Sequence, residues 1–320
     1  MQDGASFSYT YDANGSITSV TQNSVTVTYA YDALGQLIRV NDPNDHSMAP
    51  SALPNGTTWI YEYDLGGNIL SKTWYPYTTA EAPTGGTAIT YTYGNAHWKD
   101  QLTSYNGAAI TYDGIGNPVH DGTWTYTWQN GRQLAEMSSA GDTVRFRYNA
   151  DGLRVQKVSE LTGTTDYFLH GKNIVHMTNG SSSLHFRYDA QNRPALVEYN
   201  GATYAYVYDL QGDVVGLVDG NNTMVVSYIY DAWGSPLSVT GSMSTTLGAV
   251  QPFRYRGYVW DEETGLYYLK SRYYRPEIFK FINADELIIG NLFVYCNNLP
   301  INRVDYTGQL DIDFHDSVTE

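Results

Sequence analysis

The stretch TYAYVYDLQGDVV, residues 203–215, contains the pattern that decides the fold of this 320-residue chain. Tyrosines occupy every second position up to Tyr208, which is the period of a β-strand with one aromatic face. Asp209 and Gly212 then supply turn chemistry, because aspartate accepts hydrogen bonds from amides two or three residues on and glycine tolerates a left-handed backbone. An aliphatic residue, Val214, follows. The stretch therefore predicts a strand, a turn and a second strand.

The dipeptide Tyr-Asp recurs along the chain, starting at residues 11, 31, 63, 112, 188, 208 and 230. Four residues after the tyrosine stands a glycine, except after Tyr188, where Asn192 also tolerates positive φ. Degenerate copies fill residues 124–173, which brings the expected total to about ten or eleven units over residues 5–240. The predicted turn residues are Asp12, Gly15, Asp32, Gly35, Asp64, Gly67, Asp113, Gly116, Asp209, Gly212, Asp231 and Gly234.

Composition favours an all-β fold. The 30 tyrosines and 7 tryptophans are flat, amphipathic side chains that suit half-buried pleated surfaces. A single hairpin is marginal in water, so successive hairpins must pair into one long sheet, and a long twisted sheet curls. We expect a spiralling strip of antiparallel β-hairpins that curls into a barrel or cocoon, with its rings inward. We also expect it to be closed by a C-terminal plug or by self-association through open sheet edges.

The net charge, the single cysteine and the spacing of the histidines exclude several function classes. Lys and Arg number 18 against 33 Asp and Glu, a net charge of −15, so binding to nucleic acid lacks its usual electrostatic attraction. The single cysteine, Cys296, cannot form an internal disulfide. No apolar run approaches the roughly 18 residues of a membrane span, and the histidines lack zinc-type spacing. We therefore expect no nucleic-acid partner, no membrane span, no metal and no cofactor.

The sequence changes character after the repeats. Four motifs follow: QPFRYRGY (251–258), DEETGLYYLKSRYY (261–274), FINAD (281–285) and NNLPINRVDYTG (297–308). Together with the repeats they closely resemble RHS and YD-repeat proteins, and the resemblance covers nearly the whole chain. It implies YD hairpin repeats over residues 1–250, an RHS core-associated plug over 251–308, and the start of a variable C-terminal region over 309–320, expected to be disordered.

The resemblance also implies a function. Such proteins, among them polymorphic toxins and the C component of insecticidal Tc toxins, form hollow β-shells around a toxin payload that follows the plug. A structural shell of a secreted or cell-surface bacterial protein is therefore expected, with its targeting signal outside this chain. Only twelve residues follow Gly308, too few for a toxin domain, so the payload is absent from this sequence.

The family often releases its payload by aspartyl autoproteolysis. The positions that match its acid pair and arginine are Asp285, Asp305 and Arg272, and cleavage would fall near Gln309 or Leu310. Two close carboxylates that share one proton can hydrolyse an amide, because one activates water while the other protonates the carbonyl or the leaving group. At most, this is a single-turnover aspartyl autoprotease.

Three departures leave it open whether such cleavage is active. Arg275 stands where the family has aspartate, and Tyr306 and Gln309 replace a proline and a leucine of the terminal motif. Losing the proline loosens the turn that presents the cut bond, and glutamine changes the residue before it. An extracellular adhesion or carbohydrate-binding module without cleavage therefore remains an alternative function.

Overall fold

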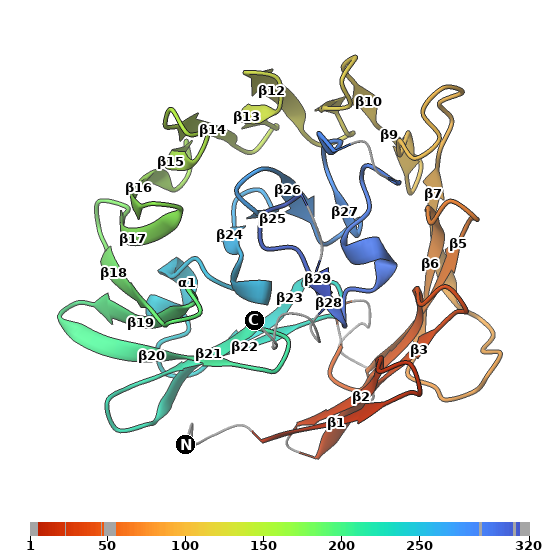
Figure 1. Cartoon of the computed structure of the whole chain (residues 1–320), viewed down its shortest axis with the longest axis horizontal. Coiled ribbons are helices and arrows are strands. Elements are labelled where there is room, and N and C mark those ends of the chain that lie inside the picture. The colour runs from red at the N-terminus through yellow and green to blue at the C-terminus, as the bar shows by residue number, and fades with distance from the viewer. Residues whose placement is uncertain are drawn as a thin grey trace.

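The computed structural model describes residues 6–22, 24–45, 47, 56–287, 290–309 and 312–313. Within these, a nine-stranded and a fourteen-stranded antiparallel sheet follow one another along the chain. In both sheets each strand pairs with its neighbours in sequence. The two sheets form an open, curled ring around a smaller C-terminal assembly (Figure 1). The predicted all-β strip of antiparallel hairpins is thus confirmed.

The first sheet consists of β1 (Phe7–Tyr11), β2 (Ile17–Gln22), β3 (Val25–Tyr31), β4 (Leu37–Asp42), β5 (Thr57–Tyr63), β6 (Ile69–Pro76), β7 (Thr87–Thr92), β8 (Ser104–Tyr105) and β9 (Ala108–Ala109). The second consists of β10 (Thr111–Tyr112), β11 (Pro118–His120), β12 (Thr125–Gln129), β13 (Gln133–Ser138), β14 (Thr143–Tyr148), β15 (Arg154–Ser159), β16 (Gly163–His170), β17 (Asn173–Thr178), β18 (Ser183–Tyr188), β19 (Pro194–Tyr199), β20 (Ala202–Tyr208), β21 (Val214–Val218), β22 (Met224–Tyr230) and β23 (Pro236–Thr240).

The C-terminal assembly lies inside the ring (Figure 1). It contains a four-stranded sheet and a two-stranded sheet, joined by short helical turns. Its elements are α1 (Leu247–Val250), η1 (Tyr255–Gly257), β24 (Val259–Asp261), β25 (Leu266–Tyr268), β26 (Tyr273–Arg275), β27 (Lys280–Phe281), η2 (Cys296–Asn298), β28 (Arg303–Val304) and β29 (Ile312–Asp313).

The repeat turn is built around its aspartate, as predicted. Asp12 Oδ1 accepts hydrogen bonds from the amides of Asn14 (2.8 Å) and Ser16 (2.9 Å), and Gly15 N donates to the Asp12 carbonyl (3.2 Å). Gly15 has φ +85°. The amides that reach the carboxylate are thus two and four residues on, whereas the sequence analysis expected two or three. The same bonds recur at Asp32, Asp64, Asp113, Asp189 and Asp231.

The repeat tyrosine has a role that the sequence analysis did not assign. Tyr31 Oη donates a hydrogen bond to the Ile17 carbonyl (2.6 Å), the residue that opens the second strand of the preceding unit. The tyrosine hydroxyl therefore ties such a hairpin to the one before it. Equivalent bonds join Tyr63 to Leu37, Tyr93 to Ile69, Tyr148 to Leu134, Tyr188 to Ile174, Tyr208 to Pro194 and Tyr230 to Val214.

Each repeat hairpin also contains a β-bulge beside its turn. Thr10 pairs with Ser19, yet its neighbour Tyr11 pairs with Ile17, so Thr18 has no partner in the register. A bulge bends its strand and increases the local twist. The bulges recur at the same place in the other repeat units, so the strip bends repeatedly along its length.

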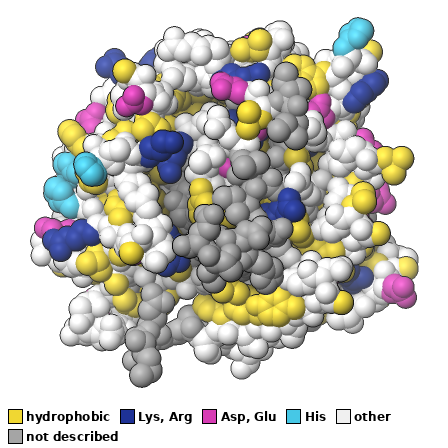
Figure 2. Space-filling model, viewed as in Figure 1, with side chains coloured by type: hydrophobic (Ala, Val, Ile, Leu, Met, Phe, Trp, Pro, Cys, Tyr) yellow, Lys and Arg dark blue, Asp and Glu magenta, His cyan; other side chains and the backbone are white. Residues whose placement is uncertain are grey.

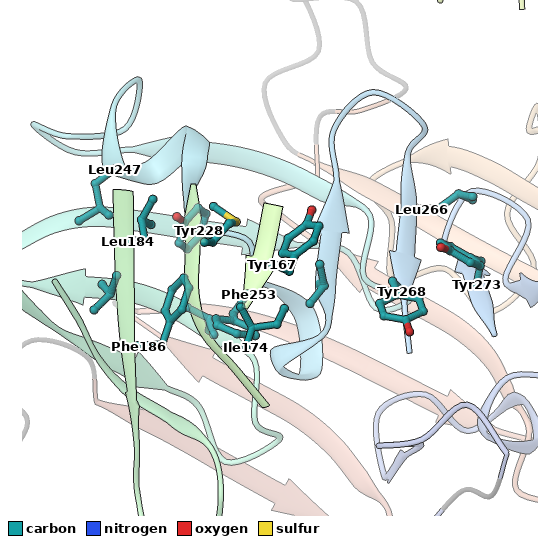
Figure 3. Packing of buried hydrophobic residues seen from close by; sticks show 14 of the residues in the cluster. Tyr167, Ile174, Leu184, Phe186, Tyr228, Leu247, Phe253, Leu266, Tyr268 and Tyr273 are labelled. Carbon is teal, nitrogen blue, oxygen red and sulfur yellow. The ribbon is translucent and has the colours of Figure 1, made fainter. Parts of the chain in front are cut away.

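The inner faces of the sheets pack on the C-terminal assembly. Tyr167, Phe186 and Tyr228 of the strip gather with Phe253 and Tyr268 of the assembly (Figure 3). The rings of Phe186 and Phe253 meet edge to face at 5.1 Å. Aromatic side chains bury much apolar area and prefer such geometry. The rings of the repeats therefore face inward, as predicted.

The end of the strip contacts its beginning. Trp233, at the tip of the turn between β22 and β23, is completely buried. Its ring stacks on Phe279 at 4.4 Å and meets the edge of Tyr61, on β5, at 5.9 Å. The Leu210 amide, at the previous turn but one, donates to Tyr9 Oη on β1 (3.2 Å). These side-chain contacts bring the two ends of the open ring together at a seam.

Candidate self-cleavage site

The structure brings Arg272, Asp285 and Asp305 together. Arg272 precedes β26, Asp285 lies beyond β27 and Asp305 follows β28. Arg272 Nη2 lies 2.7 Å from Asp285 Oδ2 and 3.7 Å from Asp305 Oδ2. All three residues are buried, with exposures of 6%, 8% and 2%. The electrostatic interactions between this buried guanidinium and the two carboxylates are strong, because little water screens the charges.

The chain after Asp305 wraps around the Asp305 carboxylate. Asp305 Oδ1 accepts hydrogen bonds from the amides of Thr307 (3.1 Å), Gly308 (2.7 Å) and Gln309 (3.2 Å). Arg272 Nε donates to the Gly308 carbonyl oxygen. The backbone that the sequence analysis expected to be cut is therefore held directly against the acid pair and its arginine.

Glycine is the only residue type that suits position 308. Its φ is +76°, a conformation that L side chains rarely adopt. A Cβ atom there would lie 2.7 Å from Ser271 Oγ and 3.1 Å from both Arg272 N and Leu269 O. Glycine thus allows the chain to approach the arginine closely.

Burial shifts the pKa values of Asp305 and Arg272. It raises the pKa of Asp305, although Arg272 and the three backbone amides act against the rise. Burial also lowers the pKa of Arg272 to about 10, while Asp285 and Asp305 act in the opposite direction. Asp285 forms the direct ion pair with the guanidinium. The raised pKa of Asp305 favours its protonated form, and hydrolysis by an acid pair requires one carboxyl that carries a proton.

A cavity of about 570 Å³ opens beside these residues. Its lining includes Arg272, Asp285, Thr307 and Gln309. The cavity gives a water molecule, and the chain leaving Gln309, room next to the acid pair. Leu310, the other residue expected near the cut, lies outside the described residues.

Two further residues take part that the sequence analysis missed. The Leu292 carbonyl accepts hydrogen bonds from Arg272 Nη1 (3.1 Å) and from the Asp285 amide (2.9 Å). Tyr258 Oη accepts one from the Asp305 amide (3.0 Å). No side-chain signal marks Leu292, because only its backbone is used. Tyr258 belongs to the first motif after the repeats, which gave no hint of this contact.

The departures from the family pattern lie at different distances from the site. Arg275 does not reach the acid pair: it forms an ion pair with Asp121 (2.6 Å) and donates to Tyr126 Oη, which ties the C-terminal assembly to the strip. Tyr306 is 42% exposed. Gln309 borders the cavity and donates its amide to Asp305.

The described residues offer neither a metal site nor a membrane-spanning helix. Among them, no group of three or more His, Cys, Asp or Glu side chains is placed to hold a metal ion. Over the same ranges, no helix is both long and apolar enough to span a membrane.

The chain is similar in sequence to known proteins. Residues 2–309 match the sequence profile of the family described as Teneurin YD-shell. The chain is 31% identical to tRNA nuclease WapA of Bacillus subtilis strain 168 and covers 15% of it, with 96% of this chain aligned. It is 26% identical to toxin subunit YenC1 of Yersinia entomophaga, with 94% of this chain and 36% of that one aligned.

A solved structure shows the same fold. The crystal structure of TcdB2-TccC3-Cdc42 superimposes with a TM-score of 0.72 at 18% identity, covering 98% of this chain and 17% of that one. The chain thus spans a small part of the proteins that it resembles, and the aligned part is the shell.

Proposed function

This chain belongs to the Teneurin YD-shell family, and from that premise we propose that it is the closing part of a secreted bacterial shell that encloses a toxin payload. One aligned relative is named a tRNA nuclease and another a toxin subunit, and the chain covers 15% and 36% of them. A segment shared by a nuclease and a toxin subunit is suited to a task that both need, such as containment. The differing activities would lie in other segments of those proteins.

The proposal includes release of the payload by self-cleavage next to Gly308. Asp285, ionised against Arg272, takes a proton from water as the water oxygen bonds to the carbonyl carbon. Asp305 gives its proton to the departing amide nitrogen as the C–N bond breaks, and Arg272 holds the carbonyl oxygen. The observation that carries this proposal is that Arg272 binds both Asp285 and the Gly308 carbonyl.

The geometry favours the bond after Gly308, because the oxygen of that carbonyl is the one bound by Arg272. The next bond, after Gln309, is also close, because the Gln309 amide binds Asp305 (3.2 Å). Holding the bond in place lets the chain act as its own substrate at high effective concentration.

Intact-mass spectrometry of the purified full chain tests the proposal. We expect a product that ends at Gly308 or Gln309, and only the uncut mass for Asp285→Asn and for Asp305→Asn. Asp151→Asn is a matched control, since Asp151 borders the same cavity away from the acid pair. Uncut wild-type chain after prolonged incubation, with a native circular dichroism spectrum, would contradict self-cleavage.

The alternative of carbohydrate binding has less support. Sugar binding by stacking needs exposed ring faces. Tyr206 and Tyr228 of the repeats are buried, with exposures of 2% and 3%, and Tyr206 packs against Phe253. We therefore retain the shell as the proposed function.

A further inference from the structure

The backbone directly before Asp285 is bound by residues of the strip. The Ala284 amide donates a hydrogen bond to the Gly116 carbonyl (3.1 Å), and Arg132 Nη1 donates one to the Ala284 carbonyl (2.8 Å). Gly116 lies in the turn between β10 and β11, and Arg132 lies in the turn between β12 and β13. Both backbone polar groups of Ala284 are therefore held by the strip.

The strip also holds Asp285 through a second segment of the assembly. The Asp285 amide donates to the Leu292 carbonyl (2.9 Å), which accepts a further hydrogen bond from Arg272 Nη1 (3.1 Å). The Leu292 amide in turn donates to Asp100 Oδ2 (2.7 Å). Asp100 lies between β7 and β8, and a carboxylate is a stronger acceptor than a neutral group. This strip residue therefore fixes Leu292, whose carbonyl contacts both Arg272 and Asp285.

Close packing restricts movement of the two segments that carry these bonds. Ala284 is completely buried, and a Cβ atom at Gly116 would lie 2.8 Å from the Ala284 Cβ and 2.6 Å from the Trp98 ring. The ring centroids of Trp98 and of Phe293, the neighbour of Leu292, are 5.8 Å apart. Strip and assembly thus touch at both segments, and such close-packed surfaces leave little room for displacement.

The strip contributes charged groups of both signs to this contact. On the face seen in Figure 2, Lys and Arg side chains lie among Asp and Glu side chains and do not form a patch of one sign. At the cleavage site, Asp100 binds a backbone amide and Arg132 binds a backbone carbonyl. Arg132 also borders the cleavage cavity. Burial lowers the pKa of Arg272, and the charge of Arg132 lowers it further, so the two guanidinium groups lie near one another.

The ion pair of Asp285 with Arg272 depends on accurate placement. Asp285 Oδ2 lies 2.7 Å from Arg272 Nη2. A misplacement of about 1 Å at a reacting group can cost about 100-fold in rate. Groups that hold the backbone of Asp285 therefore control the reactivity of the acid pair without touching the bond that is cut.

We propose that Asp100 and Arg132 are positioning residues that hold Asp285 against Arg272, so that the acid pair is complete only while the strip is docked on the C-terminal assembly. The effect on cleavage rests on the proposed function, whereas the placement of Asp285 is measurable without any cleavage. A chain whose strip has not closed around the assembly would then stay uncut.

The rate of self-cleavage in the full chain, followed by intact mass, is the first test. We expect Asp100→Leu and Arg132→Met to slow cleavage by at least about tenfold while the circular dichroism spectrum stays native. Asp100→Asn should stay within about threefold of the wild-type rate, because the amide oxygen of asparagine still accepts the Leu292 hydrogen bond. Wild-type rates in folded Asp100→Leu and Arg132→Met would overturn the proposal.

Two strip residues away from the cleavage site provide matched controls. Asp166 is half-buried, as Asp100 is, and accepts a hydrogen bond from Gln156 (2.7 Å). Arg145 forms an ion pair with Glu136 (2.7 Å). Asp166→Leu and Arg145→Met should cut at the wild-type rate, and slowing equal to that of the site variants would also overturn the proposal.

The pH profile separates positioning from proton transfer. A positioning residue exchanges no proton with the substrate, so Asp100→Leu should lower the rate by the same factor at every pH. A shifted midpoint of the profile in this variant would assign Asp100 to proton transfer and would overturn its positioning role.

Hydrogen exchange gives a readout that does not need cleavage. In the full chain carrying Asp305→Asn, we expect Asp100→Leu to make the amides of Asp285 and Leu292 exchange at least about fivefold faster, with exchange in β15 to β18 unchanged. Unchanged exchange at Asp285 would overturn the proposal, whether or not the wild-type chain cuts itself. Faster exchange in a protein whose wild type stays uncut would support the positioning of Asp285 and contradict only the proposed cleavage.

Discussion

Asp305 has two tasks that are usually separate. Its carboxylate positions the segment from Thr307 to Gln309 through three backbone amides, and in the proposed reaction it also protonates the leaving nitrogen. A cut after Gly308 would detach the Gln309 amide from the chain, and the site would then lose part of its own support after one turnover. The proposed site would therefore be limited to a single cut.

The surroundings of Asp305 predict a pH dependence. Its pKa is raised by burial, so its protonated form is stabilised in the folded chain. Cleavage requires this proton, and the cleaved fraction at fixed time should therefore fall as pH rises through the folded pKa. The stability that protonated Asp305 contributes has the same pH dependence. It is fully present below the pKa of Asp305 in the unfolded chain and is lost as pH rises through its pKa in the folded chain.

A time course of intact mass at several pH values checks this expectation. Circular dichroism at each pH shows that the chain stays folded. A cleavage rate that increases with pH over the same range would assign the proton to another group.

The residues of the candidate cleavage site could be predicted from the sequence only in part. Asp285, Asp305 and Arg272 were predicted from motifs, and the structure places them together. The carbonyls of Gly308 and Leu292 were not predicted, because a backbone acceptor leaves no trace in residue identity.

At the scale of the hairpin, the tyrosine hydroxyl forms a hydrogen bond that joins one repeat unit to the preceding one. Tyr31→Phe removes the hydrogen bond to Ile17 O and leaves the ring in place. We expect the free energy of unfolding to fall by about 1 kcal/mol, the usual net value of one such bond. Urea unfolding followed by fluorescence measures the change.

Tyr11→Phe is the matched control. Tyr11 is the repeat tyrosine of the first described unit and is 48% exposed. We expect a change within about 0.5 kcal/mol. Equal losses in the two variants would show that the hydroxyl acts through something other than the bond between units.

The sequence predicted most elements and missed those without the repeat signature. The strands and turns followed from alternating rings and the aspartate. The turn from Asp219 to Asn222 was missed: it has the same hydrogen bonds, yet no tyrosine precedes it. The helix α1 was also missed: it begins at Leu247, which is fully buried, in a segment without the repeat signature. Burial there depends on contacts with β22 that no local pattern reveals.

At the scale of the whole molecule, Trp233 is the main contact of the seam. Trp233→Ala should lower the free energy of unfolding by about 3–5 kcal/mol, the range for truncating a large buried ring. Leu34→Ala is the control, since Leu34 holds the same place in its turn and is 74% exposed; it should cost less than about 0.5 kcal/mol. Equal costs by thermal or urea unfolding would mean that the seam contributes little.

The contact of Trp233 with Tyr61 could not be predicted from sequence. Local periodicity fixes each hairpin, yet the meeting of two distant turns depends on the curvature summed over all units between them. Small errors in that curvature accumulate, so the diameter of the ring is visible only in the structure.

The bulge beside each repeat turn has a consequence for how such proteins can grow. Since the bend is placed once in every unit, a gene can gain or lose one whole unit and keep the arc smooth, and only its length changes. A duplication of half a unit would reverse the direction of every later strand and disturb the alternation of turns. Copying residues 183–202 in tandem is thus a natural route to a wider shell, and repeat number becomes the quantity on which selection for cargo size can act.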